Sequence, residues 1–237
     1  MANVALIIAG GTGARMHQNI PKQFLTVNDK PIIIYTLECF ENHPEIDGIV
    51  VSCLDGWQEM LWAYVKQFKI TKVVDIVVGG KNGQDSIRNG VYAIADRYQQ
   101  DDLIMVHDAI RPMLPASVIS DNIVKCKKYG NAITVIPCME AMLRSDDEIE
   151  SEDSILRNSL FRAQTPQTVS VKDMVKLHKD AIEAGNTNSV ATCTLLLEMG
   201  YKVYFAKGSE LNIKITTVDD ITIFKALLAT QDSPWMK

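Results

Sequence analysis

The chain has 237 residues, of which 47% are hydrophobic and 22% are charged, and its formal net charge is −5. This composition is typical of a globular protein and excludes a fibrous or disordered chain. The negative charge argues against a broad basic surface for nucleic acid, so an anionic ligand would need a local cluster of Lys and Arg. The length fits one large domain, and we predict a single domain over residues 1–237.

The five cysteines are scattered along the chain and form no C-x-x-C pair, so they predict neither a zinc site nor a redox disulfide. The sequence contains no signal-like segment and no apolar run approaching about 18 residues. We therefore expect a cytoplasmic protein that binds no membrane.

Short apolar runs alternate with helix-like patterns along most of the chain. The segments with a strand pattern are residues 4–8, 46–53, 73–78, 103–106, 132–136 and 202–206. The segments with apolar residues at helical spacing are residues 31–40, 56–68, 86–98, 117–129, 172–184, 191–199 and 218–228. This alternation predicts an α/β fold with a parallel sheet and helices on both faces. Ligands bind such sheets at the carboxyl ends of the strands.

A loop of small residues follows the first predicted strand. It consists of Ala9, Gly10, Gly11, Thr12 and Gly13, and the cations Arg15 and Lys22 come soon after it. Such a loop lets backbone N–H groups approach an anion, and nearby cations can hold its phosphates. Met16 stands where a dinucleotide-binding fingerprint needs a third glycine, and a P-loop would need a Gly-Lys-Ser/Thr that is missing. The alternative is a plain turn between a strand and a helix.

A second glycine segment, residues 79–86, follows the third predicted strand. Gly80 permits close approach of the backbone to a ligand. Ser86 either contacts a nucleotide base or caps the next helix, and for an isolated serine capping is the favoured interpretation.

Asp108 and Arg111 follow the strand pattern at 103–106, in the motif VHDAIRP. A carboxylate at the carboxyl end of a strand is well placed to bind Mg²⁺, and an arginine beside it can hold a phosphate. The alternative is a structural Asp–Arg turn before a proline. His107 is a candidate base, but its position on a buried strand favours a core histidine.

Residues 140–159 interrupt the alternation with an acidic, polar stretch that contains Arg157. This stretch predicts either a solvated loop or a projecting hairpin arm that pairs with another subunit. The motif QTPQ follows at residues 164–167.

Near the end of the chain, Lys214 lies between apolar neighbours, as on a strand edge that faces a cleft, and Asp219 and Asp220 are typical of a helix start. The whole set of cations, one strand-end carboxylate and two glycine loops is what in-line attack at phosphorus requires. The sequence indicates no Ser-His-Asp or Cys-His relay.

Six motifs in order resemble one known family: AGGTGARM, PKQFL, GG with a later DS, VHDAIRP, QTPQ and NIKITT. The chain resembles the cytidylyltransferases that act on 2-C-methyl-D-erythritol 4-phosphate and their relatives that act on ribitol 5-phosphate. The resemblance covers residues 4–228. It implies a Rossmann-like nucleotidyltransferase domain, a protruding β-arm at about residues 138–163, Mg²⁺ as cofactor and a homodimer built through the arm.

The resemblance also implies roles for individual residues. The loop from Ala9 to Gly13 would wrap the CTP phosphates and base edge, and Gly80 and Ser86 would complete the cytidine pocket. Arg15, Lys22 and Lys214 would act at the α-phosphorus. Asp108 would bind Mg²⁺ and the acceptor, with Arg111 and Thr165 on the acceptor side. Arg157 would reach the acceptor phosphate in the partner subunit.

The departures from the family pattern fall mainly on the acceptor side. Glu140-Ala141 and Val190-Ala191 replace the usual Asp-Thr and Thr/Ser-Asp pairs, and Lys81 and Gly83 stand where the family usually carries an Arg or an acidic residue. An unpaired substrate hydroxyl in a closed site costs about 1–3 kcal/mol, so these changes bear on acceptor choice. We predict CMP transfer from CTP to a ribitol-5-phosphate-like polyol, for surface-polymer synthesis.

Three alternatives stay open on the sequence. The first is the methylerythritol substrate of isoprenoid synthesis. The second is a non-catalytic nucleotide-binding subunit, and the third is a nucleotidyltransferase that uses another base.

Overall fold

A computed structural model of the chain describes residues 1–11 and 20–231. The predictions made for Thr12, Gly13 and Arg15 lie outside these residues. Within them, no helix is both long enough and apolar enough to cross a membrane.

Seven strands form a central sheet in the order β11-β7-β10-β6-β1-β4-β5. Their bounds are β1 (Asn3–Ala9), β4 (Gly48–Cys53), β5 (Val73–Val78), β6 (Leu103–Asp108), β7 (Asn131–Pro137), β10 (Phe161–Ser170) and β11 (Phe205–Lys207). The pairings among β6, β1, β4 and β5 are parallel, as is that of β11 with β7. The predicted α/β fold with a mostly parallel sheet is confirmed.

Strand β10 differs from the sequence prediction, which contained no strand at residues 161–170. It pairs antiparallel with both β6 and β7, with Gln167 opposite Val106. Its first half therefore lies at the same edge of the sheet as the carboxyl ends of β1, β4, β5 and β6. The QTPQ motif reaches the predicted ligand edge through this reversed strand.

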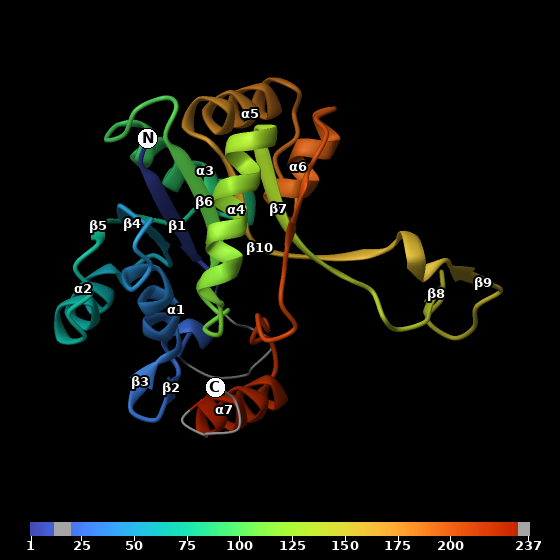
Figure 1. Cartoon of the computed structure of the whole chain (residues 1–237), viewed down its shortest axis with the longest axis horizontal. Coiled ribbons are helices and arrows are strands. Elements are labelled where there is room, and N and C mark those ends of the chain that lie inside the picture. Colours follow the sequence, from blue (N-terminus) through green and yellow to red (C-terminus); the bar gives the residue numbers. More distant parts are fainter. Residues whose placement is uncertain (12–19, 232–237) are drawn as a thin grey trace.

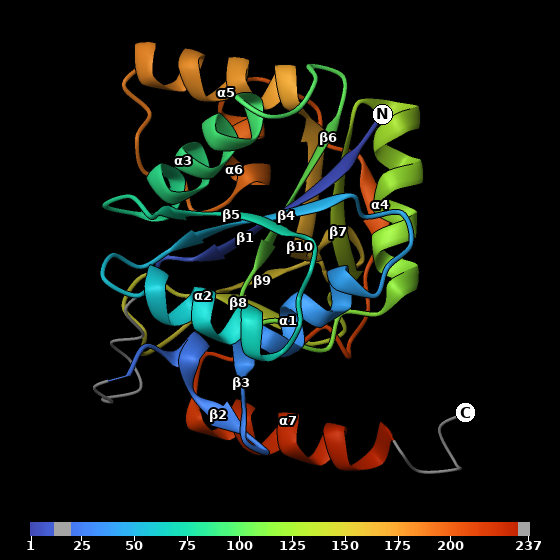
Figure 2. The ribbon, with the colours of Figure 1, turned by 90° about the vertical axis from the view of Figure 1, so that its left-hand side faces the viewer.

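Six helices cover the two faces of the sheet (Figure 2). One face is covered by α1 (Ile32–Glu41), α2 (Gln58–Gln67) and α4 (Ala116–Tyr129), and the other by α3 (Gly83–Ala95), α5 (Val171–Glu183) and α6 (Thr192–Glu198). Successive side chains of a strand point to opposite faces, so Ala5 and Ile7 of β1 belong to one core while Val4 and Leu6 belong to the other. Apolar residues on both faces explain why β1 reads as a continuous apolar run.

A smaller core lies between the edge of the sheet and α7 (Val218–Gln231). Phe224 of α7 is fully buried there against Val27, Ile32 and Ile215. The short hairpin of β2 (Thr26–Val27) and β3 (Lys30–Pro31) and the 3₁₀ turn η2 (Lys22–Phe24) complete this region. It holds the segments that follow the first glycine loop against the segment that carries Lys214.

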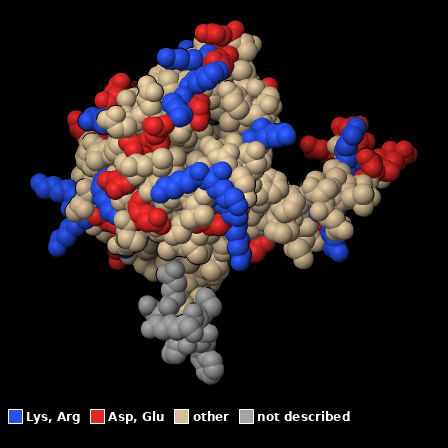
Figure 3. Space-filling view, turned by 45° about the horizontal axis from the view of Figure 1, so that its top comes forward, with Lys and Arg blue, Asp and Glu red and all other residues tan. Residues whose placement is uncertain are grey.

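Residues 138–160, between β7 and β10, leave the body of the molecule as a long arm (Figure 1). The arm is slightly shorter than the predicted 138–163, because residues 161–163 pair with β7 in the sheet. The arm contains an antiparallel hairpin of β8 (Met142–Arg144) and β9 (Asp153–Ile155), followed by the 3₁₀ turn η3 (Arg157–Ser159). Of the two readings that the sequence left open, the projecting hairpin is the one found. Figure 3 shows acidic side chains gathered at its tip, while Leu143 and Leu156 expose 67% and 80% of their surface.

Candidate active site

A cleft of about 530 Å³ opens at the carboxyl edge of the sheet. The ends of β1 and β6, the start of α3, the first half of β10, the loop before α6 and the segment around Lys214 form its walls. The predicted site residues that line it are Ala9, Gly10, Gly11, Lys22, Gly80, Ser86, Asp108, Arg111, Thr165 and Lys214. One chain thus brings together all the predicted site residues that the structure describes, except Arg157.

One side of the cleft, which we call the glycine side, consists of residues 9–11 and 79–86. At two of its glycines the packing leaves no room for a side chain: a Cβ at Gly80 would lie 2.1 Å from Cβ of Asp85, and one at Gly10 would lie 2.9 Å from Oγ of Ser86. The Ser86 hydroxyl accepts a hydrogen bond from the Gly80 N–H (3.0 Å) and donates one to the Asn82 carbonyl (2.8 Å). Ser86 therefore stabilises the conformation of the glycine turn at residues 80–82.

The favoured reading of Ser86 as a helix cap is wrong. Helix α3 begins at Gly83, three residues before Ser86, and its N-cap is Asn82, whose side chain accepts from the Asp85 N–H (2.9 Å). The apolar periodicity begins only at Ile87, and for this reason the sequence placed the helix start too late.

Gln23 holds the first glycine loop in place, a role that the sequence analysis missed. Its buried amide donates to the carbonyls of Ala9 (2.8 Å) and Gly11 (3.0 Å). Because Gln23 lies in η2 directly after Lys22, the same contacts position Lys22 in the cleft wall. The motif PKQFL contains this glutamine, but no local pattern reveals its role, because the atoms that it contacts lie 12 and 14 residues away.

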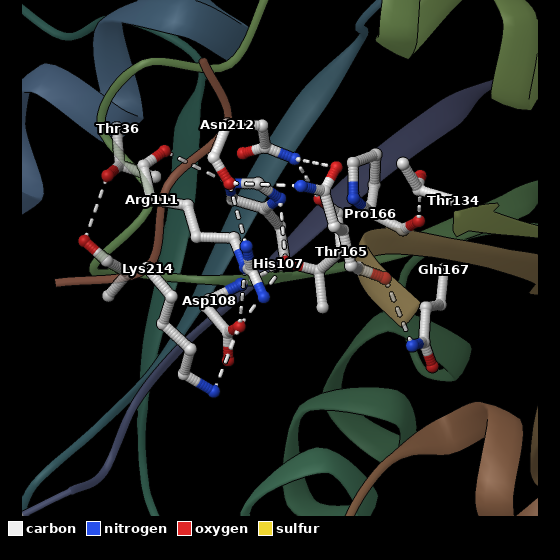
Figure 4. Close-up of polar contacts among 12 residues, drawn as sticks. Thr36, His107, Asp108, Arg111, Thr134, Thr165, Pro166, Gln167, Asn212 and Lys214 are labelled. Atoms are coloured by element: carbon white, nitrogen blue, oxygen red, sulfur yellow. Dashed lines mark hydrogen bonds and ion pairs between the residues drawn. The ribbon is translucent and has the colours of Figure 1, made fainter. Parts of the chain in front are cut away.

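The opposite side, which we call the charged side, centres on Asp108 (Figure 4). Its Oδ2 accepts from Arg111 Nε (2.9 Å) and lies 3.2 Å from Lys214 Nζ. Burial raises the pKa of the Asp108 carboxyl, but the neighbouring charges of Lys214 and Arg111 outweigh it and lower the pKa to about 2. Asp108 is therefore ionised at neutral pH and holds two cations at the sheet edge.

Thr165 and His107 complete the charged side. Thr165 Oγ1 accepts from the Asp108 N–H (3.1 Å) and lies 3.1 Å from His107 Nδ1. The peptide bond between Thr165 and Pro166 is cis. His107 is fully buried, and burial lowers the pKa of its imidazole to about 3. The structure thus favours a core histidine over a general base at this position.

Asn212 links the segments of the charged side to one another, and the sequence analysis did not single it out. Its carbonyl accepts from Arg111 Nη1 (2.8 Å), and its side chain donates to the Thr165 carbonyl (2.8 Å). The prediction that Lys214 lies on a strand edge is wrong, because the chain around Lys214 has no strand partner in the described structure. Contacts of Asn212 and a backbone hydrogen bond from the Ile215 N–H to the Ile110 carbonyl (2.9 Å), rather than a strand ladder, hold this segment at the cleft.

The loop before α6 brings Val190 and Ala191 to the cleft. The buried side chain of Gln84 fastens this loop to α3: its amide donates to the Asn186 carbonyl (2.8 Å), and its oxygen accepts from the Ser189 N–H (2.7 Å). The departure from the family pattern at Val190-Ala191 therefore faces the ligand space.

Among the predicted site residues that the structure describes, Arg157 does not line the cleft. It lies in η3 on the arm, and its Nη1 donates to the Met139 carbonyl (3.2 Å). Glu140 and Ala141 lie at the base of the same arm and are exposed.

A metal ion would find few protein ligands here. Within residues 1–11 and 20–231 there is no group of three or more His, Cys, Asp or Glu side chains able to hold one. Asp108 is the one acidic residue among the described residues that line the cleft. Asp220 instead accepts from the N–H groups of Thr216 (2.7 Å) and Thr217 (2.8 Å) at the start of α7, as expected for a helix start.

Comparison with known proteins agrees with the geometry. The sequence profile of the 2-C-methyl-D-erythritol 4-phosphate cytidylyltransferase family matches residues 3–230. The chain is 44% identical over 230 residues to a ribitol-5-phosphate cytidylyltransferase of Lacticaseibacillus paracasei, covering 96% of this chain and 98% of that protein. It is 40% identical over 232 residues to a protein of the same name from Vibrio parahaemolyticus, covering 98% of each.

A solved structure shares the fold. The crystal structure of 4-diphosphocytidyl-2C-methyl-D-erythritol synthase from Anaerococcus prevotii matches with a TM-score of 0.81 at 22% identity, over 96% of both chains.

Proposed function

This chain belongs to the 2-C-methyl-D-erythritol 4-phosphate cytidylyltransferase family, and on that basis we propose that it transfers CMP from CTP to a phosphorylated polyol, with ribitol 5-phosphate as the preferred acceptor. The observation that carries the proposal is the cleft with two unlike sides. A close-packed glycine turn and a cluster of Asp108, Arg111 and Lys214 line the same cleft of about 530 Å³. A nucleoside triphosphate and a second phosphate need such a combination of backbone donors and cations.

In the proposed reaction, an oxygen of the acceptor phosphate attacks the α-phosphorus of CTP in line. A new P–O bond forms as the bond to the β-phosphate breaks, and the products are a CDP-polyol and pyrophosphate. Lys22 and Lys214 line the cleft and would offset the charge that develops on the phosphorus oxygens. Arg15 would share this task by analogy with the family. Positioning and charge stabilisation supply most of the catalysis in such transfers.

Mg²⁺ is part of the proposal, as the ion that offsets charge on the leaving pyrophosphate. It prefers phosphate and carboxylate oxygens and is commonly held by one or two carboxylates plus the substrate phosphates. Asp108 fits that requirement only in part, because its Oδ2 already holds two cations. Asp108 would therefore give the ion at most its other carboxylate oxygen, Oδ1. Phosphate oxygens of the triphosphate would supply further ligands.

We also propose a homodimer in which the arm of one copy reaches the cleft of the other. The arm carries exposed apolar side chains, including Leu143 and Leu156, that have no partner surface within the described chain. It also carries Arg157 away from its own cleft, so this residue could meet an acceptor phosphate only in a second copy. Light scattering at micromolar concentration tests this: a monomer with full activity would contradict a role for Arg157 in trans.

The choice of ribitol 5-phosphate rests on the two relatives that carry that activity in their names and on Val190-Ala191. These two side chains cannot supply the hydrogen bonds of the usual Thr/Ser-Asp pair, and they line the cleft. A methylerythritol acceptor is the second candidate, because the family profile is named for it. A CDP-ribitol product would fit the synthesis of a cell-surface polymer from a cytoplasmic nucleotide.

The deciding experiment is pyrophosphate release from CTP and Mg²⁺ with ribitol 5-phosphate, arabinitol 5-phosphate, glycerol 3-phosphate or 2-C-methylerythritol 4-phosphate. We expect the highest kcat/KM with ribitol 5-phosphate. Higher turnover with the methylerythritol compound would overturn the acceptor choice, and no turnover despite CTP binding would favour a non-catalytic subunit. The same assay with ATP, GTP and UTP tests the base.

A further inference from the structure

His107 makes two hydrogen bonds inside the charged side, although no part of it reaches the cleft (Figure 4). Its Nε2 lies 3.3 Å from the Arg111 carbonyl, and its Nδ1 lies 3.1 Å from Thr165 Oγ1. The ring also packs edge-on against Phe40, with centroids 5.1 Å apart. These contacts fix the imidazole in one orientation.

The partners of the two ring nitrogens determine which of them carries the proton. A carbonyl only accepts hydrogen bonds, so Nε2 must be the protonated nitrogen that donates to Arg111. A neutral imidazole has one N–H, so Nδ1 then carries a lone pair. That lone pair needs a donor, and the Thr165 hydroxyl is the donor at hand.

The Thr165 hydroxyl has another possible acceptor, the Oδ2 of Asp108, but that atom lies 3.5 Å away against 3.1 Å for His107 Nδ1. Oδ2 is moreover occupied by Arg111 and Lys214. The shorter contact to an otherwise bare nitrogen is the stronger hydrogen bond. The single proton of Thr165 is therefore committed to His107 and points away from the cleft.

We propose that His107 is a positioning residue that fixes the polarity of Thr165, so that Thr165 Oγ1 offers the substrate an accepting lone pair and no proton. A hydroxyl oxygen has two lone pairs, and one already accepts from the Asp108 N–H (3.1 Å). The other is left for the cleft, which Thr165 lines.

This polarity selects the chemistry of the ligand group that Thr165 meets. A phosphate oxygen is an acceptor and would oppose the Thr165 lone pair, whereas an alcohol hydroxyl can donate to it. The inference rests on the proposed function and adds to it: Thr165 contacts a free hydroxyl of the acceptor polyol. The acceptor phosphate then lies elsewhere, where the cations of the cleft can reach it.

Long-range ¹⁵N–¹H NMR of the His107 ring tests the first step without any turnover. We expect a protonated Nε2 and an unprotonated Nδ1 at pH 7, with the signal assigned by its loss in His107→Asn. A proton on Nδ1 would overturn the proposal, whether or not the chain proves to be a cytidylyltransferase.

Kinetics of three variants test the second step. His107→Leu removes the acceptor of the Thr165 proton, Thr165→Val removes the hydroxyl, and His107→Asn keeps an oxygen near the place of Nδ1. We expect His107→Leu and Thr165→Val each to lower kcat/KM for the polyol phosphate about tenfold to hundredfold. KM for CTP should change less than twofold, and His107→Asn should recover most of the loss.

A double variant separates positioning from a merely structural role. If His107 acts through Thr165, His107→Leu combined with Thr165→Val should be no worse than Thr165→Val alone. Additive losses, or a parallel rise in the KM for CTP, would overturn the proposal.

Acceptor analogues test the polarity itself. The set consists of ribitol 5-phosphates in which one hydroxyl at a time is replaced by hydrogen or by fluorine, which cannot donate. At the hydroxyl that contacts Thr165, we expect replacement by hydrogen and replacement by fluorine to lower kcat/KM of the parent enzyme by a similar factor. In Thr165→Val, the same two replacements should have little effect on kcat/KM. If the fluorinated analogue is used as well as the parent polyol at every position, Thr165 is not an acceptor of a substrate hydroxyl and the proposal fails.

Discussion

The two sides of the cleft are built in different ways. The glycine side is made of short contiguous segments whose shape depends on the absence of side chains, as the 2.1 Å approach at Gly80 illustrates. The charged side is made of side chains from residues as far apart in sequence as Asp108, Thr165 and Lys214. A side built from the backbone tolerates few substitutions where its glycines are closely packed. A side-chain-built side depends on the strands and loops that bring its members together.

The two sides therefore differ in how they should fail. Changes on the glycine side should affect local structure and nucleotide binding, whereas changes on the charged side should affect transfer to the acceptor while the fold persists. The following predictions test that distinction, starting with the largest expected effect.

Asp108→Asn should lower kcat/KM for the polyol phosphate by about 10²–10³-fold, because the neutral amide no longer holds the cations of Arg111 and Lys214 in place. Steady-state kinetics with each substrate varied in turn measures the loss. Asp101→Asn is the matched control: Asp101 pairs with Lys172 at 2.8 Å on an exposed surface, and such pairs contribute little. A loss below tenfold in Asp108→Asn would show that the charged side is not essential.

Gly80→Ala should lower the free energy of unfolding by about 1–3 kcal/mol and raise the KM for CTP, because the new methyl group meets the backbone of Asp85. Gly83→Ala is the control, since a Cβ there has nothing within 4 Å. Urea unfolding of both variants measures the difference. Equal stability of the two variants would contradict the close packing of the glycine side.

A buried histidine behind the glycine side should make stability depend on pH. His178 of α5 is buried, and burial together with Arg88 lowers the pKa of its imidazole from 6.5 to about 4. The unfolded chain therefore binds a proton at a higher pH than the folded chain does, so the free energy of unfolding falls as pH drops from 6.5 toward 4.

His178→Leu should flatten this slope, which is at most about 1.4 kcal/mol per pH unit for one group. Urea unfolding at several pH values measures it. Activity at pH 7 should be unchanged, because His178 is not among the residues that line the cleft. A slope identical to that of the parent chain would show that His178 is protonated equally in both states.

Gln84→Ala should have a small effect on catalysis, a threefold to tenfold rise in the KM for the polyol phosphate, since losing about 1 kcal/mol of hydrogen bonding loosens the loop at Val190. Asn89→Ala, on the same helix but with an exposed contact to the Val78 carbonyl, should leave the KM unchanged. If only the KM for CTP rises in Gln84→Ala, this loop belongs to the nucleotide rather than to the acceptor.

Local patterns in the sequence determined the alternation of strands and helices and the position of the glycine side. The segment at 73–78 was predicted with the bounds that β5 has, and the helix expected at 117–129 differs from α4 by one residue. Both glycine segments directly follow predicted strands, and the parallel sheet places them together at one edge. These features depend on neighbours in the chain, so hydrophobic periodicity and glycine spacing reveal them.

Only the tertiary structure decided how the charged side is assembled. The pairing of Gln167 with Val106 joins strands about sixty residues apart, and it brings Thr165 to His107 and Asp108. Asn212 then binds Arg111 and the Thr165 carbonyl, and the Ile215 N–H donates to the Ile110 carbonyl (2.9 Å), so the segment that carries Lys214 is held in the same place without a strand of its own. Such contacts leave no periodic trace in the sequence, because each depends on packing between distant segments rather than on local spacing.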